Sequence, residues 1–186
     1  MAAVHLIERE EAEAGVADVF EAAERHFGQV PNLVRALANN PTLCRSITEF
    51  MIAGLRPGRV DWGFKELLIL KTMRSMKSYY GYGAHEKLAT ELGVPVEKMG
   101  DLANSLWQTS SRFTEPERVM LEFATQVARD ANDVKDEHWQ RMKAHWDNGQ
   151  LLEMNAVITT FIQIGRIGDT LGVCDPVLFT KPVSSV

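Results

Sequence analysis

Cysteine is scarce in this sequence of 186 residues, which contains only Cys44 and Cys174. The two lie far apart and form no CxxC pair, which argues against a disulfide scaffold, a zinc finger and a dithiol redox site. Basic runs are absent too, and 25 acidic against 20 basic side chains give a formal net charge of −5. Such a chain is a poor candidate for binding nucleic acid, which requires a concentrated basic surface.

Long apolar runs are also missing. No stretch approaches the roughly 18 consecutive apolar residues that a membrane-spanning helix needs. The first residues turn acidic early and show no basic segment followed by an apolar one, so no secretory signal is indicated. We therefore expect a cytoplasmic protein without nucleic-acid or membrane partners. With 45% hydrophobic residues, the chain can bury a core without disulfides or metals.

Strand signals are nearly absent, and the sequence predicts an all-α fold. The one β-branched cluster, at residues 157–160, lies inside a longer helical pattern. The last helix of the chain is apolar over most of its surface, which indicates burial from several sides and leads us to expect a homo-oligomer. Caps, prolines and glycines place the expected helices at residues 8–26, 30–39, 41–55, 61–76, 79–92, 95–107, 114–129, 136–146 and 150–171.

Glu66 is a charged residue at a position that the helical pattern assigns to the core. Its neighbours on the same face of the helix expected at 61–76 are all apolar. They are Trp62, Ile69, Leu70 and Met73. The polar residues of this helix gather on another face, where a surface glutamate would be expected. They are Lys65, Lys71, Thr72, Arg74 and Ser75.

His85 repeats this anomaly in the next helix. Small and apolar residues, with Tyr82 among them, surround it on its face, while the charged residues of the helix lie mostly elsewhere. The two helices are consecutive and are joined near residues 77–78, so they can pack as a hairpin. That packing would allow Glu66 and His85 to meet.

A buried carboxylate loses its hydration, so it must be paired or protonated. A carboxylate paired with an imidazole is an arrangement that general acid–base catalysis uses. Tyr80 and Tyr82 would supply hydroxyl groups nearby, and Gly81 and Gly83 leave space for a small ligand. The alternative is a hydrogen bond that only clamps two helices together, and structural pairs of this kind are common.

The segment ELLILKTMRSMKSYYGYGAHEKLATELG, residues 66–93, resembles the core of the carboxymuconolactone decarboxylase and AhpD-like alkylhydroperoxidase superfamily. That core consists of a glutamate, an apolar helix, the pattern C-x-x-C-x-x-x-H and a helix ending in glycine. Glu66 and His85 match its glutamate and histidine. The flanks VPNLVRALANNP, TEPERVMLEFATQVARD and GQLLEMNAV also fit. The resemblance implies an AhpD-like helical domain at 28–174, an N-terminal helical arm at 1–27 and a tail at 175–186.

Ser78 and Gly81 stand at the two cysteine positions of that pattern. Neither residue forms a thiolate, so the dithiol peroxidase mechanism of the AhpD branch is excluded. The resemblance then implies the thiol-free branch, whose decarboxylase members act on small lactone acids without a cofactor. It also implies a trimer or a hexamer, which agrees with the apolar last helix.

Proton transfer is the mechanism that the resemblance implies. His85 would act as general base or acid, and Glu66 would orient the imidazole and stabilise its cation. Tyr82 would hydrogen-bond a developing enolate oxygen. Tyr80 and Ser78 are expected to contact the substrate. Decarboxylation, β-elimination and double-bond isomerisation all pass through such an enolate, and the sequence does not choose among them.

Arg166 lies on a polar stripe of the last expected helix, and it would hold a substrate carboxylate if that stripe lines the pocket. A solvated face or a pair with Asp169 is the alternative. No metal site is expected, because His138 and His145 lack the spacing and the carboxylate of a helical metal site. The acid–base pair alone also provides too few ligands.

Three functions remain open from the sequence. The first is a cofactor-free decarboxylase, lyase or isomerase of a small organic acid, lactone or aromatic-degradation intermediate. The second is a peroxidase-like detoxifying enzyme that uses a reductant other than its own thiols. The third is a non-catalytic, ligand-binding oligomer that retains the fold.

Overall fold

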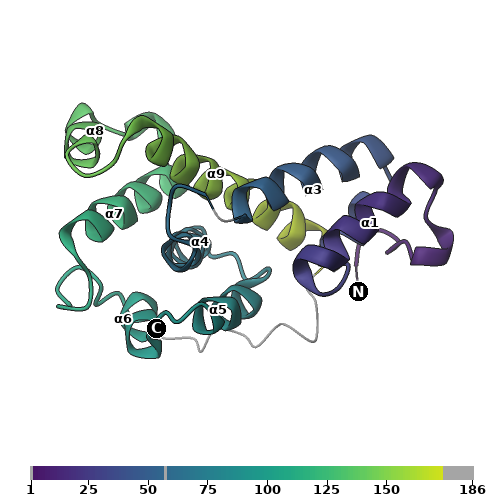
Figure 1. Cartoon of the computed structure of the whole chain (residues 1–186), viewed down its shortest axis with the longest axis horizontal. Coiled ribbons are helices and arrows are strands. Elements are labelled where there is room, and N and C mark those ends of the chain that lie inside the picture. Colours follow the sequence, from purple (N-terminus) through teal and green to yellow (C-terminus); the bar gives the residue numbers. More distant parts are fainter. Residues whose placement is uncertain (1, 57, 174–186) are drawn as a thin grey trace.

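The computed structural model describes residues 2–56 and 58–173 of the chain. Within these ranges the structure is helical and has no strand, which confirms the predicted all-α class (Figure 1). None of the described helices is long and apolar enough to cross a membrane. The α-helices are α1 (Ala14–Phe27), α2 (Asn32–Leu37), α3 (Pro41–Leu55), α4 (Trp62–Ser75), α5 (Tyr82–Glu91), α6 (Val96–Ala103), α7 (Glu115–Arg129), α8 (Asp136–Lys143) and α9 (Asn148–Leu171).

The helix boundaries follow local signals in the sequence. The side chain of Asp61 accepts a hydrogen bond from the backbone N–H of Phe64 at 2.8 Å and so caps the start of α4. Thr114 begins α7 with a capping box, as its spacing to Glu117 predicts. Gly172 ends α9 in the left-handed conformation, with φ 62°.

Several predicted helices are longer than the observed ones, and glycine or another left-handed residue accounts for two of the differences. The helix expected at 8–26 is interrupted: a short 3₁₀ turn at Arg9–Glu11 precedes α1, and Glu13 is extended before it. The helix expected at 79–92 begins only at Tyr82, because Gly81 has φ 70°. The helix expected at 95–107 ends at Ala103, before the left-handed residue Ser105. The helix expected at 136–146 ends at Lys143.

Helix α4 lies at the centre of the molecule. It packs against α5, α6, α7 and α9, and Figure 1 shows it nearly end-on with these helices around it. Every residue from 63 to 70 is buried, as are Thr72 and Met73. Of the polar face that we predicted for this helix, Lys65 and Thr72 are buried, whereas the other three residues are half-buried. The predicted polar surface is therefore wrong for Lys65 and Thr72.

Helix α9 buries most of its apolar side chains against α3, α4 and α7 of the same chain. Leu152, which is 70% exposed, is the main exception among its large apolar residues. Packing within one chain thus accounts for most of the apolar surface that led us to expect an oligomer.

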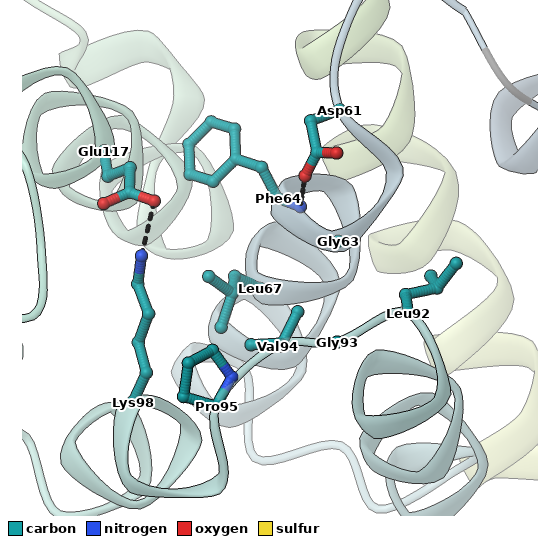
Figure 2. Close-up of a pocket in the computed structure, with 10 residues that line it drawn as sticks. All are labelled: Asp61, Gly63, Phe64, Leu67, Leu92, Gly93, Val94, Pro95, Lys98 and Glu117. Atoms are coloured by element: carbon teal, nitrogen blue, oxygen red, sulfur yellow. Dashed lines mark hydrogen bonds and ion pairs between the residues drawn. The ribbon is translucent and has the colours of Figure 1, made fainter.

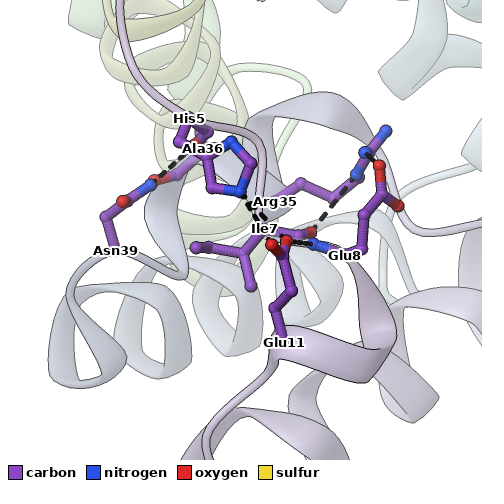
Figure 3. Close-up of polar contacts among 7 residues, drawn as sticks. All are labelled: His5, Ile7, Glu8, Glu11, Arg35, Ala36 and Asn39. Carbon is purple, nitrogen blue, oxygen red and sulfur yellow. Dashed lines mark hydrogen bonds and ion pairs between the residues drawn. The ribbon is translucent and has the colours of Figure 1, made fainter.

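The N-terminal residues are attached to the body of the protein by polar contacts (Figure 3). The guanidinium of Arg35 on α2 pairs with the carboxylate of Glu8. The side-chain amide of Asn39 donates to the carbonyl of His5 at 2.8 Å. The backbone N–H of Ala3 donates to the carbonyl of Leu171 at 2.8 Å, which links the first residues to the end of α9. The expected tail at 175–186 lies outside the described residues.

Lys65 is a buried cation that ties three helices together. Its side chain is 1% exposed, and its ammonium group pairs with the Glu153 carboxylate on α9 at 2.9 Å. The same group donates to the carbonyls of Gly54 at 3.1 Å and Arg56 at 2.5 Å, at the end of α3. A buried charge requires such complete pairing, because the interior does not solvate it.

We expect Lys65→Met to lower the free energy of unfolding by about 3–5 kcal/mol, because it leaves the buried end of Glu153 and two carbonyls without their cation. Urea unfolding followed by circular dichroism measures this loss. Lys87→Met is the matched control, since Lys87 lies 3.9 Å from Glu91 in an exposed pair. It should cost no more than about 0.5 kcal/mol. Equal losses in the two variants would show that the buried pair has no special weight.

Candidate functional site

The carboxylate of Glu66 lies inside the molecule, on the central helix α4, with a side chain that is 0% exposed. Its Oε2 atom is 2.7 Å from Nδ1 of His85, the shortest contact that the group makes. Its Oε1 atom accepts a hydrogen bond from the indole N–H of Trp62 at 3.1 Å. Glu66 and His85 therefore meet across the α4–α5 hairpin, as the sequence predicts.

His85 lies in the first turn and a half of α5, and its side chain is 15% exposed. The ring packs edge-on against Phe161 of α9, with centroids 4.6 Å apart and an interplanar angle of 88°. Its Nε2 side faces Gly81, where a Cβ atom would lie 3.9 Å from Nε2. In the part of the chain that the structure describes, no group hydrogen-bonds this nitrogen.

The two nitrogens of the His85 ring thus have different surroundings. Nδ1 is engaged with a buried carboxyl group, while Nε2 lies on the partly exposed side. If the carboxylate accepts from Nδ1–H, the neutral ring presents an unprotonated Nε2 that can take a proton. The same carboxylate stabilises the imidazolium that results. This arrangement suits a general base that later returns the proton as an acid.

Ser78 and Tyr80 lie in the turn between α4 and α5, against two glycines of α9. A Cβ atom at Gly165 would come within 2.9 Å of the Ser78 hydroxyl oxygen, and one at Gly168 would come within 2.4 Å of the Tyr80 ring. Phe161, which contacts His85, is one turn before Gly165. The described turn therefore runs along one face of α9, and only glycine permits this close approach.

The Ser78 hydroxyl is buried and has no hydrogen-bond partner among the described residues. It occupies the first cysteine position of the family pattern. The backbone N–H of Tyr80 donates to the Asp169 carboxylate on α9 at 3.2 Å. Ser78 and Tyr80 thus lie on the same side of α9 as His85. That they contact a substrate stays a prediction.

Tyr82 is buried, 3% exposed, and its hydroxyl group lies near Arg74. Burial raises the pKa of this phenol, and the positive charge of Arg74 opposes the rise. The expected role of Tyr82 toward an enolate stays a prediction.

Arg166 is an exposed residue of α9. It lies about 140° around the helix from Phe161, because each residue turns an α-helix by about 100°. The described chain therefore does not bring Arg166 to the acid–base pair. The observed exposure of Arg166 agrees with the alternative interpretation, in which this face of the last helix is solvated.

Trp62 contacts the Glu66 carboxylate, whereas the sequence reasoning counted it only as an apolar neighbour. Its side chain is half-buried, and its N–H group reaches the carboxylate one turn later. The signal was present in the sequence, since an indole N–H four residues before a buried glutamate can donate to it.

A pocket of about 190 Å³ lies elsewhere, between the start of α4 and the segment that joins α5 to α6 (Figure 2). None of the predicted site residues lines it. The ion pair of Lys98 with Glu117, at 2.6 Å, closes one side. Phe64, Leu67 and Val94 form apolar parts of its wall. Neither this pocket nor any other described part of the chain groups three residues of the kinds that hold a metal ion.

Cys44 is a free, fully buried residue of α3. Its Sγ atom lies 3.6 Å from the carbonyl oxygen of Val34, and burial raises the pKa of the thiol. A thiol in this state is a poor nucleophile, because the thiolate is the reactive form. Cys174 lies outside the described residues.

The fold is that of several solved structures. The debrominase Bmp8 matches with a TM-score of 0.81 and 19% identity, over 96% of this chain and 93% of that one. A peroxidase-related protein from Ralstonia eutropha JMP134, described as an alkylhydroperoxidase AhpD core, matches with a TM-score of 0.81 and 17% identity, over 100% and 98%. A peroxidase-related protein from Silicibacter sp. TM1040 has a TM-score of 0.81 and 16% identity, over 97% and 95%.

Comparisons of sequence alone add nothing to these matches. No family model matches the chain, and no curated protein matches it either. The solved structures show that the chain has the AhpD-like fold, in agreement with the resemblance of residues 66–93. At identities of 16–19%, they show the fold and not the activity.

We expect Gly168→Ala to destabilise the protein by about 1–3 kcal/mol, because the new methyl group must displace the Tyr80 ring. Gly100→Ala is the matched control, since a Cβ atom there meets nothing within 4 Å and the residue lies inside α6. It should stabilise the protein by about 0.5–1 kcal/mol through helix propensity. Thermal unfolding of both variants measures the difference, and stabilisation by both would refute the close approach.

Proposed function

We propose that this chain is a cofactor-free proton-transfer enzyme, a decarboxylase, lyase or isomerase that uses Glu66 and His85. Its substrate would be a small organic acid, a lactone or an aromatic-degradation intermediate. The observation that carries the proposal is the fully buried carboxylate 2.7 Å from Nδ1 of a histidine whose other nitrogen lies on the partly exposed side. A clamp between two helices has no need to leave that nitrogen without a partner.

In the proposed reaction, Nε2 of His85 removes a proton from carbon or oxygen of the substrate. The positive charge that forms on the imidazole is stabilised by the Glu66 carboxylate at 2.7 Å. The proton then returns to another atom of the enolate or to the leaving group. A positioned acid–base group of this kind contributes about 10²–10⁴-fold to a rate, which is sufficient for an activated substrate.

The neighbouring structures support a small ring as ligand. One of them is a variant of the debrominase Bmp8 in complex with 2,3,4-tribromopyrrole. The rings of His85 and Phe161 meet in a T-shaped contact with centroids 4.6 Å apart, so an aromatic side chain lies against the imidazole. Assembly into a trimer or hexamer is part of the proposal and rests on the family resemblance, with a second copy available to complete the site.

A peroxidase-like activity is the second candidate, because two of the structural neighbours are described as peroxidase-related. In this chain the two thiol positions are Ser78 and Gly81, and Cys44 is buried. Reduction of a peroxide would therefore require an external thiol or another reductant. A non-catalytic, ligand-binding oligomer is the third candidate.

We expect Glu66→Gln to lower turnover by about 10²–10⁴-fold, because the amide no longer stabilises the imidazolium. The assay follows deuterium incorporation into enolisable acids and lactones in D₂O by NMR, which detects proton transfer before the natural substrate is known. The melting temperature should hold or rise. Glu91→Gln, an exposed change on α5, is the control and should leave both quantities unchanged.

A different result for Glu66→Gln favours the helix clamp. Exchange at the original rate, together with a loss of about 1–3 kcal/mol in the free energy of unfolding, is what a merely structural hydrogen bond predicts.

For the second candidate, we expect no consumption of hydrogen peroxide or an alkyl hydroperoxide above background with dithiothreitol as reductant, since the site lacks a thiolate. Peroxide is followed by a colorimetric assay under steady-state conditions. The double variant Cys44→Ser/Cys174→Ser is the control, because it removes both thiols of the chain. Rapid turnover that survives this change would replace the proton-transfer proposal with a thiol-independent peroxidase.

A further inference from the structure

Trp62 and Glu66 form a pair on one face of α4, one helical turn apart. The indole N–H donates to Oε1 of Glu66 at 3.1 Å, and the His85 ring takes the other oxygen at 2.7 Å. An indole N–H only donates, so Oε1 serves as an acceptor in this contact. The two contacts together fix the plane of a carboxyl group whose side chain is fully buried.

We infer that Trp62 is a positioning residue of the acid–base pair, an inference that rests on the proposed function. By holding Oε1, it keeps Oε2 directed at Nδ1 of His85. A carboxyl group bound at only one oxygen can rotate about its terminal bond, which has a broad torsional preference. Without Trp62, the orientation of the imidazole and the availability of Nε2 would vary with that rotation.

The N-terminal arm takes part in this arrangement through His26, at the end of α1. The His26 ring stacks on the Trp62 ring with centroids 6.2 Å apart and an interplanar angle of 13°. Phe27 packs edge-on against His26 at 4.7 Å. Burial, and in addition Arg56, lower the pKa of His26, which favours the neutral ring in this stack. The arm therefore contacts the residue that holds Oε1 of Glu66.

The connection thus runs from α1 through Trp62 and Glu66 to His85, with one contact at each step. The first step is a ring stack and the other two are hydrogen bonds. This assigns the arm a role in the site.

The test replaces Trp62 by Phe, which retains an aromatic ring for the stack with His26 but removes the N–H donor. The readout is the Nδ1–H signal of His85 in protein labelled with [¹⁵N]histidine, assigned by its absence in His85→Gln. We expect the exchange of this proton with water to become about tenfold faster, the factor that corresponds to losing one hydrogen bond to a carboxyl group. The ring ¹⁵N shifts of His85 should move as well.

Trp139→Phe is the matched control, because Trp139 packs edge-on against Phe123, with centroids 5.2 Å apart, and contacts neither member of the pair. It should leave the His85 spectrum unchanged. His26→Ala should speed the exchange of the His85 proton without removing the donor. An unchanged His85 spectrum in Trp62→Phe would overturn the inference. It would leave the proposed function intact, since that stands on the Glu66→Gln exchange assay.

A second measurement avoids the risk that Trp62→Phe fails to fold. The protein has four tryptophans, so four indole N–H signals are expected. Glu66→Gln should shift the signal of Trp62 and leave those of Trp107, Trp139 and Trp146 in place. A Trp62 signal that does not respond to Glu66→Gln would overturn the hydrogen bond on which the inference depends.

Discussion

A carboxyl group without access to water, that of Glu66, is the constraint on which the centre of this molecule depends. Buried polar atoms must find partners, and each oxygen of Glu66 has one, from Trp62 on its own helix and from His85 on the next. To make the second contact, α5 must return alongside α4 at one particular register. The site and the packing of the central hairpin are therefore one arrangement, and neither can be changed without the other.

Helix α9 completes this arrangement through the small size of two of its residues. Gly165 and Gly168 allow the turn before α5 to lie against the helix backbone, while Phe161 packs on the ring of His85. The turn is thus held by α9 and the histidine by α4 and α9 together. Helix α4, the turn that follows it and the distant helix α9 together determine the position of one imidazole, and such rigid support is what a preorganised site requires.

The positions of Glu66 and His85 could be predicted from the sequence because a helical stripe is a local pattern. The surroundings of Lys65 could not, since its partners at Gly54, Arg56 and Glu153 come together only in the folded chain. The start of α5 at Tyr82 could not be predicted either, because the left-handed conformation of Gly81 decides it. The presence of the helices and the meeting of Glu66 with His85 could therefore be predicted from the sequence. The burial of Lys65 and Thr72 could not, because it depends on the helices that surround α4.

The backbone conformation of Gly81 opposes a cysteine at this position, which is the second cysteine position of the pattern C-x-x-C-x-x-x-H. Its φ of 70° is a conformation that a residue with a Cβ atom adopts at a cost of about 1–2 kcal/mol. Space is not the obstacle, since a Cβ atom there would meet its neighbours at 3.7–3.9 Å. A cysteine introduced at this position would therefore be opposed by the main chain itself. Introducing a dithiol at positions 78 and 81 therefore carries a cost in the main chain that the exchange of two side chains does not remove.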